Sequence, residues 1–417
     1  MARFKLYLLK QQDEQNLYLM KIISNLIFIA IYAVAFSCSQ QHKESVPCLD
    51  VSVNYPGKEI NLTDIAKVRY LYLNSDNEKF LYRGYIQAMS TNKVVVTDSR
   101  SGDIFIFSKD GAPVSRLNRR GRGPGEYNNA HRVFYDEEVD ELFVIEPFPK
   151  NMIHVYSING EHKRDINLPK ETMLANDIVS LDNQSFLFID YNPEYKALIP
   201  DEKGVGPSIR VPVKEYVVPL YRISKADGAV LNSAELSVSP LFLGIIENGI
   251  RIPGRKNRLI KNKAGAFICY PEIDTVFMYG NETGLTPVIY KTPPVSSGNP
   301  LIYLNNCVDV GKYQFLQTYT ARREEGAYPF PSQYYLRNKE TGEIVKQKLF
   351  LPDYQGKEFF IGPTEGKING LENGVLLELE LTELKEANAK NKLSGKLKEL
   401  VDTLADDDNN IFVIVEF

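Results

Sequence analysis

The sequence has no tryptophan, only four histidines and four cysteines, and a formal net charge of −4 over 417 residues. So small a net charge gives no basis for binding nucleic acid or an anionic lipid surface. The absence of tryptophan removes the residue that most often stacks on sugars. Four cysteines are too few for a disulfide scaffold, and we expect Cys269 and Cys307 to be buried as small hydrophobic residues.

Common catalytic motifs are also missing. The sequence contains no G-x-S-x-G nucleophile elbow, no H-E-x-x-H zinc motif and no P-loop. The histidines, at 42, 131, 154 and 162, are predicted to be too few and too scattered for a histidine-based metal site. We therefore expect no cofactor, and a function in binding is favoured over catalysis.

Long apolar runs are absent except near the N-terminus. Residues 1–19 have no recognisable role and are interpreted as an over-extended start before Met20. Lys21 and the apolar stretch Ile22–Phe36 have the pattern of a secretory signal, too short for a transmembrane span. Cys38 follows a small residue as in a bacterial lipobox, which predicts lipidation of Cys38 and attachment to the outer membrane. The alternatives are a plain signal peptide with an incidental cysteine and a retained anchor helix. The predicted domains are a signal peptide at 1–37, a tether at 38–60 and a folded domain at 61–417.

Short alternating segments and recurrent turns dominate the rest of the chain. A turn with glycine follows a strand-like segment five times, and these glycines are 49 to 68 residues apart: Gly111, Gly160, Gly228, Gly284 and Gly342. Glycine provides the positive φ that tight hairpins require. Spacing of this kind predicts a β-propeller of four-stranded antiparallel blades, with a β-sandwich as the alternative.

The two ends of the folded domain are predicted to pair. Gly374–Leu381 and Asn410–Phe417 read as strands at the C-terminus, where a blade is left incomplete. The segment Leu62–Leu73 is interpreted as one strand entered by a turn at Thr63-Asp64, and its part Ile65–Leu73 would complete that blade as the outermost strand and bury both edges. With five full blades this predicts six. Residues 382–405 have helical spacing and are expected to pack on the propeller, with a partner-binding helix as the alternative.

These features together resemble the bacterial six-bladed β-propeller lipoproteins, relatives of NHL-repeat propellers. The resemblance depends on Cys38, the strand 62–73, the turn glycines, the helical insertion and the loop Gly121–Tyr127. That loop, GRGPGEY, matches the G-x-G-x-G-x-[FY] pattern that opens NHL blades. The resemblance implies a binding or scaffolding protein of the cell envelope, often beside systems that import glycans or peptides.

The glycine-rich loop is the first candidate site. Its glycines free backbone N–H groups that could bind an anion, and arginines add positive charge. The predicted ligand-binding residues are Arg120, Arg122, Glu126, Tyr127 and, in a separate loop, Arg255. The expected ligand is a glycan, a peptide or a partner protein. The alternative is that the glycines only turn the chain between blades and Glu126 pairs locally.

A second candidate site lies on the innermost strands, which asparagine and aspartate often precede. Such oxygens from separate strands could hold Ca²⁺, which predicts Asn176, Asp177 and Asn306 as ligands of a calcium-dependent hydrolase or lyase at the central channel. Asparagine and aspartate also favour turns for backbone reasons alone. Two hypotheses therefore remain: a non-catalytic binding lipoprotein and a calcium-dependent enzyme.

Overall fold

The computed structural model describes residues 46–417 except 77, 131, 147–150, 170–174, 191–194, 199–208, 213–215, 239–243, 248–249, 254–258, 271–272, 281–283, 298–299, 321–330, 363–370 and 372. The chain divides into the units Met1–Val46 and Pro47–Phe417, and the description below concerns the second. The predicted signal peptide and Cys38 lie outside the described residues.

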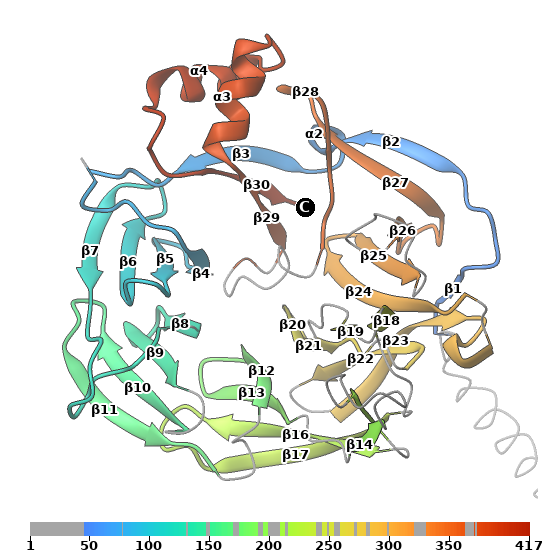
Figure 1. The fold of residues 1–417 in the computed structure, drawn as a ribbon, viewed down its shortest axis with the longest axis horizontal. Helices are drawn as coiled ribbons and strands as arrows, with labels where there is room; N and C mark the ends of the chain where they lie inside the picture. The colour runs from blue at the N-terminus through green and yellow to red at the C-terminus, as the bar shows by residue number, and fades with distance from the viewer. Residues whose placement is uncertain are drawn as a thin grey trace, which may run out of the picture. The chain divides into compact units, whose positions relative to one another are not determined.

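Antiparallel β-sheets form five blades in the order of the chain (Figure 1). The first two blades consist of β4 (Tyr85–Met89), β5 (Lys93–Asp98), β6 (Asp103–Ser108) and β7 (Pro113–Leu117), then β8 (Arg132–Asp136), β9 (Glu141–Glu146), β10 (Met152–Ser157) and β11 (His162–Asn167). The third consists of β12 (Ala175–Ser180), β13 (Ser185–Asp190), β16 (Tyr216–Ser224) and β17 (Val230–Val238).

The fourth and fifth blades follow the same plan. They consist of β20 (Leu259–Asn262), β21 (Gly265–Ile268), β22 (Thr275–Gly280) and β23 (Gly284–Thr292), then β24 (Ile302–Val310), β25 (Tyr313–Thr320), β26 (Ser332–Asn338) and β27 (Ile344–Leu351). Two hairpins are inserted, β14 (Tyr195–Leu198) with β15 (Ile209–Pro212) and β18 (Gly244–Glu247) with β19 (Ile250–Pro253). A short 3₁₀ helix, η2, covers Val295–Ser297.

The recurrent turns lie where the sequence predicts them. All five turn glycines have φ between +68° and +89°, and each either begins the fourth strand of a blade or lies two residues before its first residue. Middle strands such as β9 are buried along their whole length, whereas most residues of the outermost strand β11 are exposed. A blade whose inner strands are covered on both faces needs neighbouring sheets, which is the physical basis of the propeller.

The prediction of six four-stranded antiparallel blades is wrong. The structure has five blades, one for each turn glycine, and the residues predicted to complete a sixth form a three-stranded sheet in the part of the chain that the structure describes. Its order is β29 (Gly374–Leu379), β30 (Ile411–Glu416) and β3 (Lys67–Tyr72). Between β29 and β30 the chain forms two helices, so the sheet does not gain a fourth strand from this segment.

The N-terminal strand nevertheless pairs with the C-terminus. β3 runs antiparallel to β30, with Val68 opposite Val415 and Tyr72 opposite Ile411. The predicted strand Leu62–Leu73 is shorter than expected, because Leu62–Ile65 forms the helical turn α2. Leu62 is fully buried there, so the turn contributes an apolar residue to the core instead of a strand edge.

The segment before β3, which the sequence assigned to a tether, belongs to the folded unit from Pro47 onward. β1 (Cys48–Asp50) runs parallel to β23 and β2 (Gly57–Asn61) runs parallel to β27, so two blades carry an additional outer strand. β28 (Tyr354–Phe359) pairs with the other end of β27. These strands protect outer edges that would otherwise expose unpaired backbone groups.

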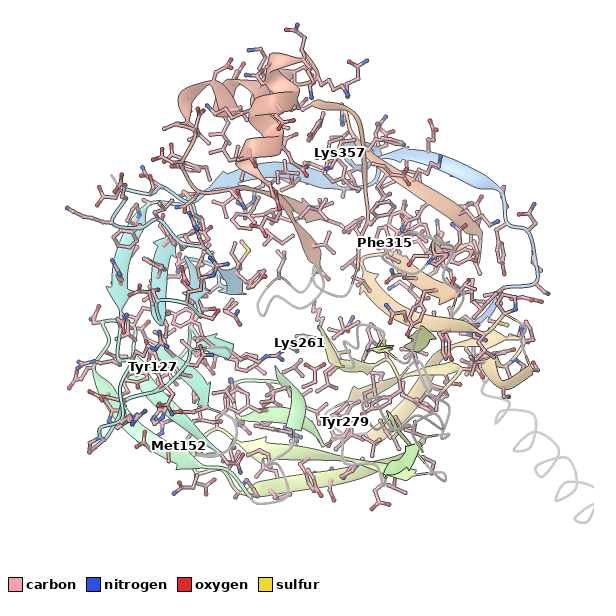
Figure 2. All side chains as sticks on the ribbon, viewed as in Figure 1. Tyr127, Met152, Lys261, Tyr279, Phe315 and Lys357 are labelled. Carbon is pink, nitrogen blue, oxygen red and sulfur yellow. The ribbon has the colours of Figure 1, made fainter. Side chains whose placement is uncertain are left out.

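Apolar clusters fill the space between each pair of adjacent sheets and close the ring of this unit. Tyr127 lies between the first and second blades, and Phe315 lies between the fifth blade and the three-stranded sheet (Figure 2). The helices α3 (Leu381–Ala389) and α4 (Gly395–Thr403) bury Leu384, Leu397 and Val401 in that last cluster. This confirms that the predicted helical insertion packs on the propeller. Cys269 and Cys307 are buried and not disulfide-bonded, as expected.

Candidate functional site

The glycine-rich loop Gly121–Tyr127 connects the first blade to the second and holds an acid of its own. The backbone N–H of Gly123 donates to Glu126 Oε2 at 2.7 Å. A Cβ on Gly121 would lie 2.0 Å from the same oxygen, so only glycine leaves room for that carboxylate. The loop is closed by hydrogen bonds from Gly121 N to the Tyr127 carbonyl at 3.0 Å and from Tyr127 N to the Arg119 carbonyl at 3.1 Å. Glu126 therefore occupies the place that an external anion was predicted to take.

Tyr127 anchors the loop between the two blades. Its ring is fully buried and packs edge-on against Tyr156, with ring centroids 6.0 Å apart. Its hydroxyl donates to the carbonyl of Gly102 at 2.8 Å and accepts from the Arg119 N–H at 3.1 Å. Burial, only partly offset by the Arg119 N–H, raises the pKa of Tyr127 to about 12. Tyr127 is therefore a neutral structural residue.

The arginines that flank the loop are used differently. Arg119 donates from Nε and Nη2 to the Gly160 carbonyl at 3.3 and 3.2 Å, and Arg120 donates from Nη1 to the Arg100 carbonyl at 2.7 Å. Arg122 is exposed, and its guanidinium has no hydrogen bond or ion pair among the described residues. Of the predicted ligand-binding residues that the structure describes, Arg122 is thus the one whose charge is uncommitted.

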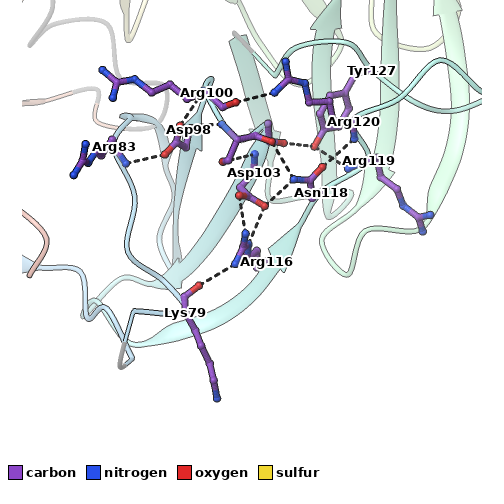
Figure 3. Close-up of polar contacts among 12 residues, drawn as sticks. Lys79, Arg83, Asp98, Arg100, Asp103, Arg116, Asn118, Arg119, Arg120 and Tyr127 are labelled. Atoms are coloured by element: carbon purple, nitrogen blue, oxygen red, sulfur yellow. Dashed lines mark hydrogen bonds and ion pairs between the residues drawn. The ribbon is translucent and has the colours of Figure 1, made fainter.

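A second turn brings two further arginines beside Arg120. The carboxylate of Asp98, at the end of β5, accepts from the backbone N–H of Arg83 at 2.9 Å and from that of Arg100 at 2.9 Å (Figure 3). Both side chains are exposed and extend to the same side of the blade in Figure 3, and neither guanidinium pairs with another described residue. Asp98 therefore positions two cations through their backbones while its own oxygens are occupied by N–H groups.

Gly84 makes this arrangement sterically feasible. A Cβ at position 84 would lie 1.7 Å from the Thr97 carbonyl oxygen, so glycine allows the chain before β4 to lie against β5. The next residue, Tyr85, is 71% exposed at the start of the innermost strand β4. We name Arg83, Tyr85 and Arg100 the arginine surface. Arg83, Tyr85 and Arg100 were not predicted from the sequence. The one local indication of a site is Arg83-Gly84-Tyr85, in which a glycine separates a cation from an aromatic residue.

Of the three predicted calcium ligands, the structure describes the side chain of Asp177. Asp177 is 4% exposed, and its two oxygens accept from Arg132 Nη1 and from the Leu259 N–H, each at 2.9 Å. Asp177 thus joins the third blade to the second and fourth. The side chains of Asn176 and Asn306, and all of Arg255, lie outside the described residues. For these residues the proposed roles remain predictions.

The prediction that the histidines are too scattered for a metal site is wrong for two of them. His154 on β10 and His162 on β11 contact the same carboxylate oxygen, Asp165 Oδ1, at 2.7 Å from His154 Nδ1 and 2.8 Å from His162 Nε2. Sequence spacing missed this cluster because a strand of regular alternation places residues 162 and 165 on opposite faces. Burial opposes ionisation of Asp165, but the hydrogen bonds from His162 and His154 outweigh it and lower the pKa of that carboxyl.

In the described part of the chain, no helix is long and apolar enough to span a membrane. Among solved structures, a protein of Bacteroides fragilis NCTC 9343 that is named as an exported protein has a TM-score of 0.58 and 14% identity, covering 89% of this chain and 99% of its own. Virginiamycin B lyase of Staphylococcus aureus has a TM-score of 0.36 and 12% identity, covering 84% and 99%. Identities this low concern the fold alone.

No match is found among curated proteins. A family model described as a domain of unknown function, DUF4934, matches residues 46–416, which is almost the whole described unit. The chain therefore belongs to the DUF4934 family.

Proposed function

We propose that this chain is an exported lipoprotein whose propeller binds an anionic glycan at the arginine surface and performs no catalysis. The observation that carries the proposal is the pair of exposed, unpaired guanidinium groups of Arg83 and Arg100, held on one buried carboxylate. The backbones of both residues are held by Asp98, so two exposed positive charges arise from one site on the blade, where an anion would offset their mutual repulsion. Such a pair of side chains is suited to carboxylate or sulfate groups, which guanidinium binds through two parallel hydrogen bonds.

The exposed ring of Tyr85 favours a glycan over a simple anion. Tyr85 is 71% exposed and lies two residues after Arg83 in the chain, so its ring offers an apolar platform to a ligand that the arginines attract. A sugar ring that carries an acidic substituent has the complementary pattern. Export is supported by the signal-like N-terminus and by the name of the Bacteroides protein of similar fold. The lipobox-like Cys38 supports the further proposal that the protein resides in the outer membrane.

The absence of catalysis is supported by Asp177. Both oxygens of this acid are occupied by protein donors from two neighbouring blades. A channel calcium ion or a general base at this position would have to break those contacts, and breaking a buried ion pair is costly. The arrangement is better explained as a link between blades.

Binding of polygalacturonate, measured by isothermal titration calorimetry, tests the proposal. The Arg83→Ala/Arg100→Ala variant should lose at least tenfold in affinity, and wild-type affinity should fall as salt is added. The matched control is Lys109→Ala/Lys263→Ala, which removes two exposed charges elsewhere. Equal affinity in both double variants would refute the arginine surface. Tight binding of polyglutamate in preference to polygalacturonate would show that the ligand is a peptide instead.

A further inference from the structure

The His154, His162 and Asp165 side chains lie on one face of the outer hairpin of the second blade. In the β10–β11 pairing His154 is opposite Asp165, so their side chains share a face. A register shift between Val155 and Tyr156 pairs Tyr156 with His162 and leaves Lys163 unpaired. This bulge turns His162 to the face that carries His154 and Asp165. One ligand atom from each of the three residues lies within 4.8 Å of the others.

The far side of the His154 ring has the support that a metal-binding histidine usually has. Its Nε2 lies 2.9 Å from Oε2 of the buried Glu146 on β9, and Glu146 in turn accepts from the Asn128 backbone N–H at 3.1 Å and from the Asn128 side-chain amide. A carboxylate on the outer ring nitrogen fixes the orientation of a ligating histidine and raises its basicity. The contact with Glu146 leaves the Nδ1 atom of His154 directed at Asp165.

The glycine-rich loop fixes His162. A Cβ on Gly125 would lie 2.7 Å from Cγ of the His162 ring, so the loop backbone lies directly against the imidazole. Tyr156 packs edge-on against the same ring at 5.5 Å, and its hydroxyl donates to the Gly125 carbonyl at 2.8 Å. The side chains of His162 and Asp165 are 34% and 33% exposed, against 2% for His154. The cluster is thus rigid on its inner side and accessible from solvent.

We propose that His154 Nδ1, His162 Nε2 and Asp165 Oδ1 bind a divalent transition-metal ion such as Zn²⁺, with water as the fourth ligand. Two nitrogens and one carboxylate oxygen suit Zn²⁺ in tetrahedral geometry. Ligand atoms about 2.0–2.2 Å from such an ion are roughly 3.3 Å apart. The present separations of 2.7 and 2.8 Å therefore have to widen by about half an ångström, at the exposed His162 and Asp165 side chains.

Uptake of the ion exchanges protons for metal. Any proton carried by His154 Nδ1 or His162 Nε2 leaves to solvent as that nitrogen coordinates the ion, and no other group is consumed. The bound ion would fasten β10 to β11 and, through His162, hold the glycine-rich loop that carries Arg122. The inference does not depend on the proposed glycan, because none of the three metal-binding residues belongs to the arginine surface.

Calorimetric titration of the untagged, EDTA-treated full chain with ZnCl₂ tests this site. We expect one Zn²⁺ per chain, no uptake of Mg²⁺, and a rise in Tm with Zn²⁺. His162→Ala and Asp165→Asn, which change exposed side chains, should each weaken Zn²⁺ binding at least tenfold and abolish the rise in Tm. Glu146→Gln should weaken binding about 10- to 100-fold, because Glu146 only positions His154.

Asp227→Asn, which changes an exposed acid outside the cluster, serves as the matched control and should bind Zn²⁺ as the wild type does. Wild-type affinity in His162→Ala, or the absence of Zn²⁺ uptake by the wild type, would overturn the proposal. The proposal would also be overturned if the Tm of His162→Ala were lower than that of the wild type by the same amount in EDTA and in Zn²⁺, since that result indicates a hydrogen-bonded cluster only. If His154→Ala fails to fold, the exposed variants still decide.

Discussion

The side-chain amide of Asn409 donates to the backbone carbonyl of Leu73 at 2.8 Å, across 336 residues of sequence. The same amide also donates to the Phe80 carbonyl at 3.0 Å, and its oxygen accepts from the Tyr82 N–H at 3.2 Å. Asn409 is 2% exposed. One buried residue ahead of β30 therefore satisfies three backbone groups around the end of β3 and the approach to β4, where the two ends of the ring meet.

Replacing Asn409 should weaken this closure. Asn409→Ala leaves two carbonyls and one N–H buried without their partner, and we expect a loss of about 2–4 kcal/mol in the free energy of unfolding. Urea unfolding monitored by circular dichroism measures it. Asp406→Asn, whose side chain is 94% exposed, is the control and should change the stability by less than about 0.5 kcal/mol. Equal stabilities of the wild type and Asn409→Ala would show that the hydrogen bonds of Asn409 contribute nothing.

The strands before β3 give a second prediction. Leu49 on β1 is fully buried in the cluster between the fourth and fifth blades, whereas Val53 in the following turn is 48% exposed. Leu49→Ala should cost about 2–5 kcal/mol, because it leaves a cavity, and Val53→Ala should cost little. Thermal unfolding of both variants checks this. Wild-type stability in Leu49→Ala would assign residues 47–56 to a tether after all.

The sequence predicts the propeller because its local rules repeat. Each turn glycine needs a positive φ, and each does adopt one, so the turn positions locate all five blades. Pairing of β3 with β30 was also predictable, since an incomplete set of strands requires a partner. The parallel strands β1 and β2 were not, because a polar segment with a proline has the composition of a linker. Their pairing depends on edges formed by residues more than 200 positions later.

The candidate sites depend still more on tertiary contacts. The glycines 121, 123 and 125 suggest anion binding, but the anion is the loop's own Glu126. Arg83 and Arg100 are separated in sequence, and their backbones are brought together by the single acid Asp98. His162 reaches the face of Asp165 only through a bulge at Lys163, which no period-2 pattern reveals. Single contacts of this kind have no signature in one sequence.

Asp103 and Arg116 should produce a pH-dependent contribution to stability. Arg116 donates from Nε and Nη2 to the two oxygens of Asp103, each at 2.8 Å. Burial alone would raise the pKa of Asp103, but hydrogen bonds from Arg116, Ser101 and Asn118 outweigh burial and lower it below its ordinary value of 3.8. A lowered folded-state pKa gives stability that is present above pH 3.8 and is lost as the pH falls through the folded-state value.

Asp103→Asn should therefore lower the Tm at pH 7, and the difference from the wild type should shrink below about pH 4. Differential scanning calorimetry from pH 7 to pH 2.5 measures the two curves. Asp110 is an exposed residue of the first glycine turn, and Asp110→Asn removes the same charge. The curve of its Tm against pH should run parallel to that of the wild type. A difference between Asp103→Asn and wild type that stays constant down to pH 2.5 would exclude the carboxylate as its source.

Lipidation of Cys38 is tested in cells. Labelling with a palmitate analogue should mark the wild type but not Cys38→Ala, because the thioether to the lipid forms at that sulfur. The outer-membrane fraction should likewise retain the wild type only. Cys48→Ala is the matched control, since it removes the next cysteine along the chain. Equal labelling of wild type and Cys38→Ala would show that the lipid is attached at another residue, and no labelling of either would show that the apolar run Ile22–Phe36 ends in an ordinary signal cleavage site.

The contact between Gly125 and His162 can be measured as a coupling energy. Gly125 has φ +65°, and a Cβ there would meet the His162 ring at 2.7 Å. Gly342 has φ +76°, and among the described residues no atom lies within 4 Å of a Cβ built on it. Gly342→Ala should thus cost only the strain of a positive φ, about 1–2 kcal/mol, whereas Gly125→Ala adds the steric clash.

Removing the ring should remove the difference. In a His162→Ala background, Gly125→Ala is expected to cost no more than Gly342→Ala, because the atoms that the new methyl group would meet are gone. Urea unfolding of the two single variants and the double variant, in EDTA, gives the coupling between positions 125 and 162. If Gly125→Ala costs the same with and without the His162 ring, the loop does not lie against the imidazole, and the proposed ion could not fix the loop through His162.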